Sequence, residues 1–163
     1  MGWSTHHSTG LIHYAPQHSY RGYTLLVSNS GNIAHLIDME GRICHEWRSD
    51  EGISYGYLLP NSNLLLRTGP AAEETSFLSR PERNLVPGGG RTTSGAILEL
   101  DWDSNVVWEY RYPFLHHDFE RLPNGNTLVL VWKSLPEELA TQVKGGYTDG
   151  SEPGQMLGDA VME

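Results

Sequence analysis

The fold is decided by the stretch Asp101-Trp-Asp-Ser-Asn-Val-Val-Trp-Glu-Tyr110, because a second version of it stands earlier in the chain, at Asp38-Met-Glu-Gly-Arg-Ile-Cys-His-Glu-Trp47. The offset that lays one stretch on the other also places Leu59-Pro-Asn-Ser-Asn63 on Leu122-Pro-Asn-Gly-Asn126. Two separate motifs that keep one register indicate an internal repeat. A third copy begins at residue 160, where Ala-Val-Met-Glu resembles the Ala-Ile-Leu-Glu that begins at residue 96, one residue out of step.

Both motifs predict β-hairpins. In the first, an acidic residue stands two positions after the Asp and is followed by Gly or Ser. Asp and Asn side chains cap the backbone of such turns, and Gly tolerates a positive φ. The Leu-Pro-Asn motif has the same turn chemistry. Around the hairpins, Ile43, His45 and Trp47 alternate with their neighbours, as do Val106 and Trp108, and this period of two is typical of β-strands.

The repeat therefore predicts a unit of four antiparallel strands, A to D. The second unit has all four, expected at 53–59, 63–68, 95–101 and 105–111. The first unit has only B, C and D, expected at 23–28, 33–38 and 42–48. The third has A and B, expected at 115–122 and 126–133, and the chain ends within its strand C.

A four-stranded antiparallel unit repeated along a chain is typical of a β-propeller blade. The sequence predicts an all-β fold in which 1–163 is a single partial propeller domain of about two and a half blades. Its expected parts are an N-terminal segment at 1–21, a first partial blade at 22–52, a full blade at 53–114, and an incomplete third blade at 115–163 with a long loop at 145–158.

Blades bury their faces only within a closed ring of roughly four to eight. We therefore expect this chain to be part of a longer propeller, or to be completed by a second polypeptide or by further copies of itself. An open two-sheet sandwich of the same strands is the alternative. One helix is expected, because Ser134-Leu-Pro-Glu137 has the form of a capping box and would begin a helix that continues to about Val143.

Composition limits the classes of partner. Acidic residues outnumber Lys and Arg 20 to 11, which argues against binding to nucleic acid. No apolar run reaches about 18 residues, so no membrane span is expected. No Gly-rich phosphate loop with a Lys follows a strand, so no nucleotide cofactor is expected.

The first residues have neither the basic nor the apolar part of a signal peptide, and Cys44 is the single cysteine, so no intrachain disulfide forms. The compartment stays open between the cytoplasm and, if a signal peptide was removed, the periplasm. Cys44 alternates with Ile43 and His45 and is expected to be buried rather than reactive.

The best candidates for chemistry are His116, His117 and Asp118, at the start of strand A of the third unit. The preceding unit has Ile53, Ser54 and Tyr55 at the equivalent positions, so a blade does not require histidine there. One imidazole can act as nucleophile or base while a neighbouring group sets its tautomer.

Two other roles remain open for the cluster. The histidines can hold a metal ion with ligands from elsewhere, although side chains adjacent on a strand point in opposite directions, so only one is expected to face the central channel and no metal site is assigned. Alternatively, Asp118 caps the adjacent turn while the histidines only pack.

Two arginines are candidates for binding an anionic substrate. Arg67 ends strand B of the full blade, and Arg91 lies in the long connection 70–93. Strands A and B are antiparallel, so the start of A and the end of B lie on one face of the ring. The connections 70–93 and 145–158 should therefore rise around the mouth where the histidines lie.

These segments resemble the arylsulfotransferase-like family, which includes the bacterial aryl-sulfate sulfotransferases. The most similar stretches are Gly22-Tyr-Thr-Leu-Leu-Val27, Leu36 to Trp47, and the combination His116-His-Asp-Phe-Glu-Arg-Leu-Pro-Asn-Gly-Asn-Thr-Leu128. The resemblance covers about residues 10–133. It implies a six-bladed propeller with its active site at the central channel.

The resemblance also implies an activity: transfer of a sulfuryl group from a phenolic sulfate ester to another phenol through a sulfohistidine, without a nucleotide sulfate donor. His117 or His116 is then a candidate for one of the central histidines. The alternatives are a non-catalytic propeller module that binds a ligand or partner, and a metal-dependent propeller hydrolase or lyase.

Overall fold

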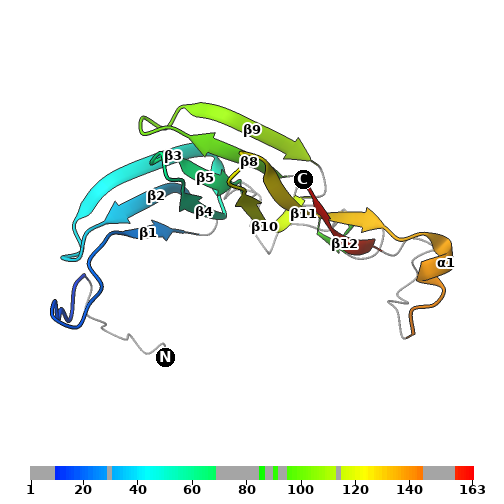
Figure 1. Cartoon of the computed structure of the whole chain (residues 1–163), viewed down its shortest axis with the longest axis horizontal. Helices are drawn as coiled ribbons and strands as arrows, with labels where there is room; N and C mark the ends of the chain where they lie inside the picture. The colour runs from blue at the N-terminus through cyan, green and yellow to red at the C-terminus, as the bar shows by residue number, and fades with distance from the viewer. Residues whose placement is uncertain are drawn as a thin grey trace, which may run out of the picture.

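A computed structural model of the chain describes residues 10–28, 31–68, 85–86, 90–91, 95–112, 115–144 and 157–163, and for residues 85, 86, 90, 91 and 157 it describes the backbone alone. The described chain is built from β-strands and one short helix (Figure 1). The prediction of an all-β fold is therefore confirmed.

The strands form three larger antiparallel sheets, here called the first, second and third sheet in chain order. The first sheet contains β1 (Thr24–Val27), β2 (Gly31–Ile37) and β3 (Ile43–Ile53), in that order. The second contains β4 (Tyr55–Leu58), β5 (Leu64–Arg67), β8 (Gly95–Leu100) and β9 (Val106–Tyr112). The third contains β10 (Leu115–Arg121), β11 (Thr127–Ser134) and β12 (Leu157–Met162).

A small two-stranded ribbon, β6 (Leu85–Val86) and β7 (Gly90–Arg91), lies within the connection between β5 and β8. Apart from this ribbon and the first residues of β12, the connections 70–93 and 145–158 lie outside the described residues. Their expected position around the histidines therefore stays a prediction.

The hairpins form as the turn chemistry predicts. Asp38 Oδ1 accepts hydrogen bonds from the backbone N–H groups of Glu40 and Arg42, both at 2.9 Å. One repeat later, Asp101 Oδ1 accepts from the N–H groups of Asp103 and Asn105, at 2.9 and 2.8 Å. The same carboxylate geometry therefore closes the β2–β3 and β8–β9 hairpins.

The positive φ angles repeat in the same way. Gly41 (φ 78°) and Ser104 (φ 66°) occupy equivalent positions in one pair of turns, and Ser62 (φ 69°) and Gly125 (φ 88°) in the other. Each turn thus needs a left-handed residue, which Gly supplies without strain and Ser supplies at some cost.

The sheets pack face to face in a row, and the second sheet is covered on both sides. Leu64, Leu66 and Leu98 pack against the first sheet around the fully buried Trp47. Leu65 and Ile97, which point to the opposite face, pack against the third sheet. Three sheets in series rule out the alternative of a two-sheet sandwich within the described residues, and the arrangement is compatible with partial propeller blades.

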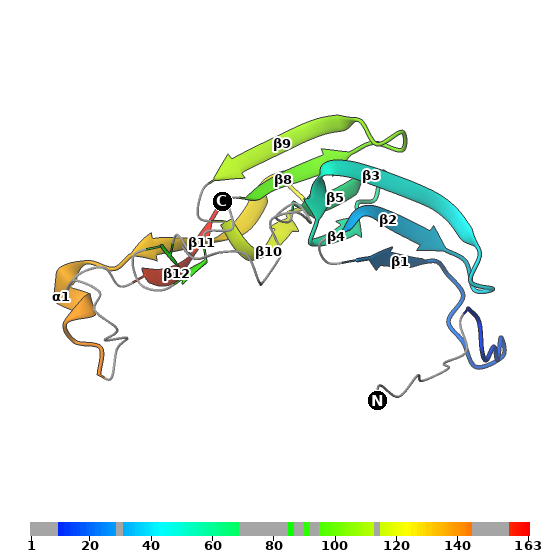
Figure 2. The same ribbon diagram turned by 180° about the vertical axis from the view of Figure 1, so that it is seen from behind.

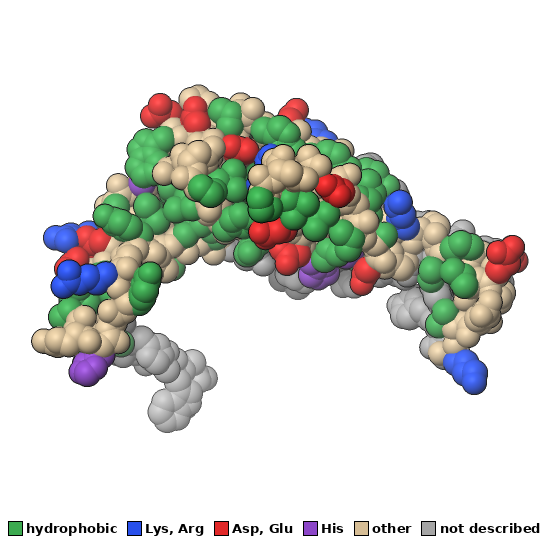
Figure 3. Space-filling model, viewed as in Figure 1, with side chains coloured by type: hydrophobic (Ala, Val, Ile, Leu, Met, Phe, Trp, Pro, Cys, Tyr) green, Lys and Arg blue, Asp and Glu red, His purple; other side chains and the backbone are tan. Residues whose placement is uncertain are grey.

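The three sheets follow an arc. Strands β1, β4 and β10 lie toward its concave side, whereas β3 and β9 run along the convex side (Figures 1 and 2). Apolar side chains reach the surface along the whole arc (Figure 3).

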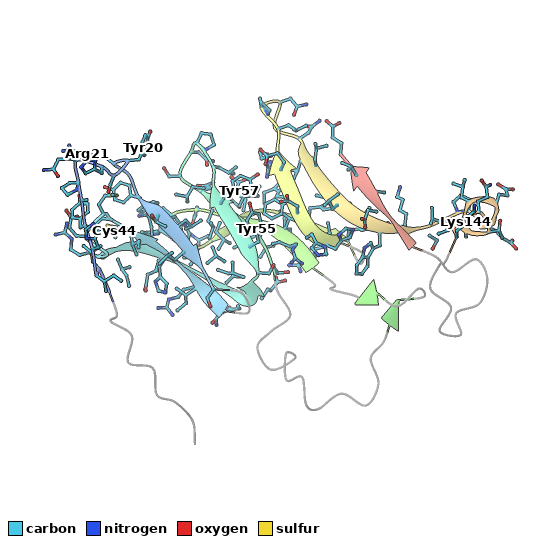
Figure 4. All side chains as sticks on the ribbon, turned by 90° about the horizontal axis from the view of Figure 1, so that it is seen from below. Tyr20, Arg21, Cys44, Tyr55, Tyr57 and Lys144 are labelled. Atoms are coloured by element: carbon cyan, nitrogen blue, oxygen red, sulfur yellow. The ribbon has the colours of Figure 1, made fainter. Side chains whose placement is uncertain are left out.

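Two local predictions are wrong. Ser134 is the last residue of β11 and pairs with Leu157, so its extended backbone cannot cap a helix. Helix α1 (Glu137–Ala140) instead begins after Pro136, with no side-chain cap, and ends before Val143. Cys44 is exposed rather than buried, at the outer end of the first sheet (Figure 4).

Candidate functional site

His116, His117 and Asp118 form a bulge in β10. Leu115 pairs with Val131 and Phe119 pairs with Val129, so three residues of β10 stand opposite the single residue between those partners. His117 adopts a φ of 50°, in the left-handed region that non-glycine residues rarely occupy. The bulge therefore interrupts the strict alternation that a regular strand would impose.

The bulge brings the two histidine rings together. His116 is 4% exposed, whereas His117 is exposed to solvent. Their Nδ1 atoms nevertheless lie 3.0 Å apart, and the rings meet edge to face with centroids 5.1 Å apart. Such a contact needs one N–H donor and one lone pair, so the two rings cannot both be protonated while it lasts.

The buried ring of His116 has a defined environment. It stacks on Trp132, with centroids 4.8 Å apart and planes 27° apart. Its Nε2 atom lies 3.4 Å from a carboxylate oxygen of the largely exposed Asp159. Nε2 is buried and makes no hydrogen bond within the part of the chain that the structure describes. Nε2 is therefore available to bind an atom of a ligand.

The neutral form of His116 is favoured. Burial lowers the pKa of His116 from its ordinary value. The charge of Asp159 and the nearby backbone of Val131 oppose this effect, and the charges of His117 and Arg67 add to it. A neutral imidazole with an unpaired ring nitrogen is a competent nucleophile or base at neutral pH.

Asp118 plays a local structural part. Its Oδ1 atom accepts a hydrogen bond from the backbone N–H of Phe119 at 2.9 Å, and its side chain is exposed. This matches the interpretation in which Asp118 caps the adjacent turn. The carboxylate beside His116 is instead that of Asp159, which β12 places opposite Trp132.

Sequence reasoning missed Asp159, although a signal was present. In the alignment of the third copy with the second, Asp159 falls on Gly95, so it departs from the repeat just as the histidines do. Trp132 packs against the His116 ring.

Arg67 lies at the end of β5 and pairs with Tyr55 of β4, which is labelled in Figure 4. Its Nε and Nη1 atoms are buried and have no hydrogen-bond partner within the described part of the chain, and burial lowers its pKa. Its charge is also one of those that act on His116. Arg67 and His116 lie in neighbouring sheets, and no hydrogen bond or ion pair joins them among the described residues. The side chain of Arg91 lies outside the described residues.

Backbone contacts hold the end of β5 in place. Ser54 Oγ donates toward the carbonyl oxygens of Arg67 at 3.1 Å and Thr68 at 3.3 Å. The N–H of Ala96 donates to Thr68 Oγ1 at 2.9 Å in a buried setting. These bonds fix the backbone from which the Arg67 side chain extends.

The described residues were also compared with three other kinds of feature: a cavity, a metal-binding cluster and a membrane-spanning helix. A cavity of about 560 Å³ opens between β9 and the turn that joins β10 to β11, away from the histidines. Among the described residues, no group of three or more His, Cys, Asp or Glu side chains is arranged to hold a metal ion. In the same part of the chain, no helix has the length and apolar character needed to cross a membrane.

Comparison of this chain with protein-family models, with curated proteins and with solved structures found no match.

Proposed function

We propose that the chain supplies part of the active site of a β-propeller transferase that moves a sulfuryl group between phenols through His116. The observation that carries the proposal has two parts. Nε2 of His116, and Nε and Nη1 of Arg67 in the neighbouring sheet, are buried without a hydrogen-bond partner among the described residues, and the charge of Arg67 acts on His116. Buried polar groups without partners are rare in folded proteins, and one explanation is a ligand that pairs with them. The oxygens of a sulfate ester suit the donors of Arg67, and its sulfur is the atom that the Nε2 lone pair of His116 would attack.

Exposed apolar residues on the outer sheets support a larger ring. Val161 of the third sheet is 65% exposed, whereas Ile97, at the equivalent position of the second sheet, is fully buried. At the other end of the row, Leu26 is 47% exposed, whereas its equivalent Leu66 is fully buried. Further sheets, from more chain, a second polypeptide or further copies, would cover both faces.

The proposed reaction has two steps. The Nε2 lone pair of His116 attacks the sulfur of an aryl sulfate, the bond between sulfur and the aryl oxygen breaks, and the phenolate leaves with that electron pair. The oxygen of a second phenol, which gives up its proton, then attacks the sulfur, and the S–N electron pair returns to Nε2. The proton that the acceptor loses balances the proton that the first phenolate gains.

His117 and Arg67 have separate parts in this scheme. If Nδ1–H of His116 donates to Nδ1 of His117, the lone pair of His116 is on Nε2, where attack requires it. Arg67 would stabilise the negative charge on the sulfuryl oxygens, as fixed cations and donors do in transfer reactions. Asp159 would favour any transient positive charge on His116.

The test is transfer from 4-nitrophenyl sulfate to phenol, followed by the absorbance of released 4-nitrophenolate, with the chain and any polypeptide that co-purifies with it. His116→Ala should abolish release, and Arg67→Ala should lower it by about a hundredfold or more. His18→Ala, at an exposed position remote from the cluster in sequence, is the matched control and should leave the rate unchanged. Full activity in His116→Ala, with the fold intact by circular dichroism, would show that the proposal is wrong.

A second candidate is non-catalytic binding of an anion at the same residues, since the unpartnered nitrogens of Arg67 require an acceptor whether or not a bond is broken. This function predicts that sulfate or an aryl sulfate raises the thermal stability of the wild type but not of Arg67→Ala. It also predicts no release of 4-nitrophenolate. The two measurements together separate binding from transfer.

A further inference from the structure

Tyr55 is an exposed aromatic residue beside the candidate anion site. It is the first residue of β4, and it is 45% exposed. Strand β4 belongs to the second sheet, which has a neighbouring sheet on each face, so this exposure does not lie at either end of the row of sheets. It lies on the concave side of the arc, which Figure 4 shows from below.

The register of the second sheet places Tyr55 next to Arg67 on one face. The two residues are direct partners between β4 and β5, and Arg67 is in turn the partner of Ile97 on β8. Side chains of directly paired residues lie on the same face of an antiparallel sheet. Ile97 packs against the third sheet, so Tyr55 and Arg67 also face the third sheet. Because β4 is the strand toward the concave side, Tyr55 lies on the concave side of Arg67.

Aromatic contacts position the Tyr55 ring against the third sheet. Phe119 of β10 meets it edge to face, with centroids 5.6 Å apart and planes 66° apart. Phe119 is 4% exposed and stacks on Tyr57 with centroids 5.5 Å apart. The hydroxyl of Tyr57 accepts a hydrogen bond of 2.7 Å from the backbone N–H of Arg121. Tyr55 thus packs against side chains that are themselves held in place.

Tyr55 departs from the repeat at the same end of its strand as the histidines do. The offset between the two motifs places Tyr55 on Asp118, so a blade does not require an aromatic side chain at this position. Tyr55 begins β4, and His116 and His117 lie near the start of β10 in the neighbouring sheet. The departures from the repeat therefore gather at equivalent ends of two adjacent sheets.

We infer that Tyr55 forms a subsite for the aromatic ring of the substrate and that the site selects aryl over alkyl sulfates. The inference rests on the proposed function, because it requires the sulfate group to bind the donors of Arg67. A ring attached to that group and directed to the concave side meets the exposed ring of Tyr55. Contact between two aromatic rings adds to the free energy gained from burying apolar surface, and an alkyl group makes no such contact. Small-molecule sites commonly combine aromatic walls with a few polar groups that fix orientation.

The test compares two anions that share one charged group. Benzenesulfonate and methanesulfonate both carry a sulfonate bound through carbon, so neither contains the bond between sulfur and an aryl oxygen that transfer breaks. Isothermal titration calorimetry is done on the wild-type chain with any polypeptide that co-purifies. The dissociation constant should be about tenfold lower for benzenesulfonate than for methanesulfonate. This comparison does not depend on the folding of any variant.

Two variants then assign the preference to Tyr55. Tyr55→Leu keeps an apolar side chain but removes the ring, so it should bind benzenesulfonate about fivefold more weakly and methanesulfonate as the wild type does. Tyr55→Phe keeps the ring and should retain the wild-type preference. Tyr20→Leu is the control, because Tyr20 is 96% exposed and lies well away from Tyr55 in Figure 4.

Three results would overturn the inference: equal affinities of the wild type for the two anions, binding of neither anion, or an unchanged preference in Tyr55→Leu. The proposed transfer reaction is judged separately, by the release of 4-nitrophenolate. A protein that prefers benzenesulfonate but releases no 4-nitrophenolate would keep the subsite and lose the reaction. A protein that releases 4-nitrophenolate through His116 but binds the two sulfonates equally would keep the reaction and lose the subsite.

Discussion

The side-chain amide of Asn126 donates to the carboxylate of Glu163 at 2.8 Å, and this bond reproduces the 2.7 Å bond from Asn63 to Glu99 one repeat earlier. The two asparagines follow the Leu-Pro-Asn turns, and the two glutamates lie at or just beyond the ends of β8 and β12. The repeat therefore preserves a tertiary hydrogen bond as well as strand positions. This agreement supports the placement of β12 as the third strand of its sheet.

The two copies of this bond should differ in strength. The Glu99 side chain is only 12% exposed and also binds Arg121, whereas Asn126 and Glu163 are exposed. We expect Asn63→Ala to lower the free energy of unfolding by about 1.5–3 kcal/mol and Asn126→Ala by less than about 1 kcal/mol. Urea denaturation measures both, with Asn32→Ala at an exposed position as the control. Equal losses would contradict the expected effect of burial.

Because the backbone of His117 is left-handed, Gly should give a more stable protein than Val at this position, the reverse of the usual order in a β-strand. Val in a left-handed conformation is strained, whereas Gly is not, so His117→Val should be less stable than His117→Gly by about 1–2 kcal/mol. Both variants lose the ring contact with His116, so that loss cancels in the comparison. At Glu120, an exposed and regularly paired position of β10, the order should be reversed, with Val more stable than Gly. Urea denaturation of the four variants tests this.

Acidification should destabilise the protein through His116. Burial lowers the pKa of its folded state, so the unfolded chain takes up a proton at a pH where the folded chain does not. The stabilisation is complete above the ordinary pKa of histidine and is lost as the pH falls toward the folded value. Between about pH 7.5 and 5.5, the wild type should lose more unfolding free energy than His116→Gln. An unchanged slope in His116→Gln would contradict the prediction.

Trp47 should be the main support of the boundary between the first and second sheets. It is fully buried, and its Nε1 donates to the carbonyl of Asp101. Trp47→Ala should cost about 3–5 kcal/mol because it leaves a cavity. Trp47→Phe keeps most of the volume and removes one of two hydrogen bonds that the Asp101 carbonyl accepts, the other coming from the N–H of Ser104, so it should cost about 0.5–1.5 kcal/mol. Trp102, at 48% exposure, is the control, and its replacement by Ala should cost clearly less than Trp47→Ala; thermal or urea unfolding measures all three.

The sequence by itself determined most of the strands and their order in the second sheet. The internal repeat predicted the hairpins at Asp38 and Asp101 and the four strands of the second sheet, because turn chemistry and alternation are local properties that each short segment carries. The same local reasoning failed at Ser134. There a capping-box pattern competed with strand pairing to Leu157, a contact that lies beyond the segment.

Only the tertiary structure decided the composition of the candidate site. The β10 bulge turns the rings of His116 and His117 toward each other, although adjacent positions on a regular strand would point them apart. Pairing of β12 with β11 places Asp159 beside His116, and face-to-face packing of two sheets brings Arg67 near it. The placements of Asp159 and Arg67 could not be predicted from local patterns. Each depends on contacts between residues far apart in the chain, and the packing of the sheets determines which of these contacts form.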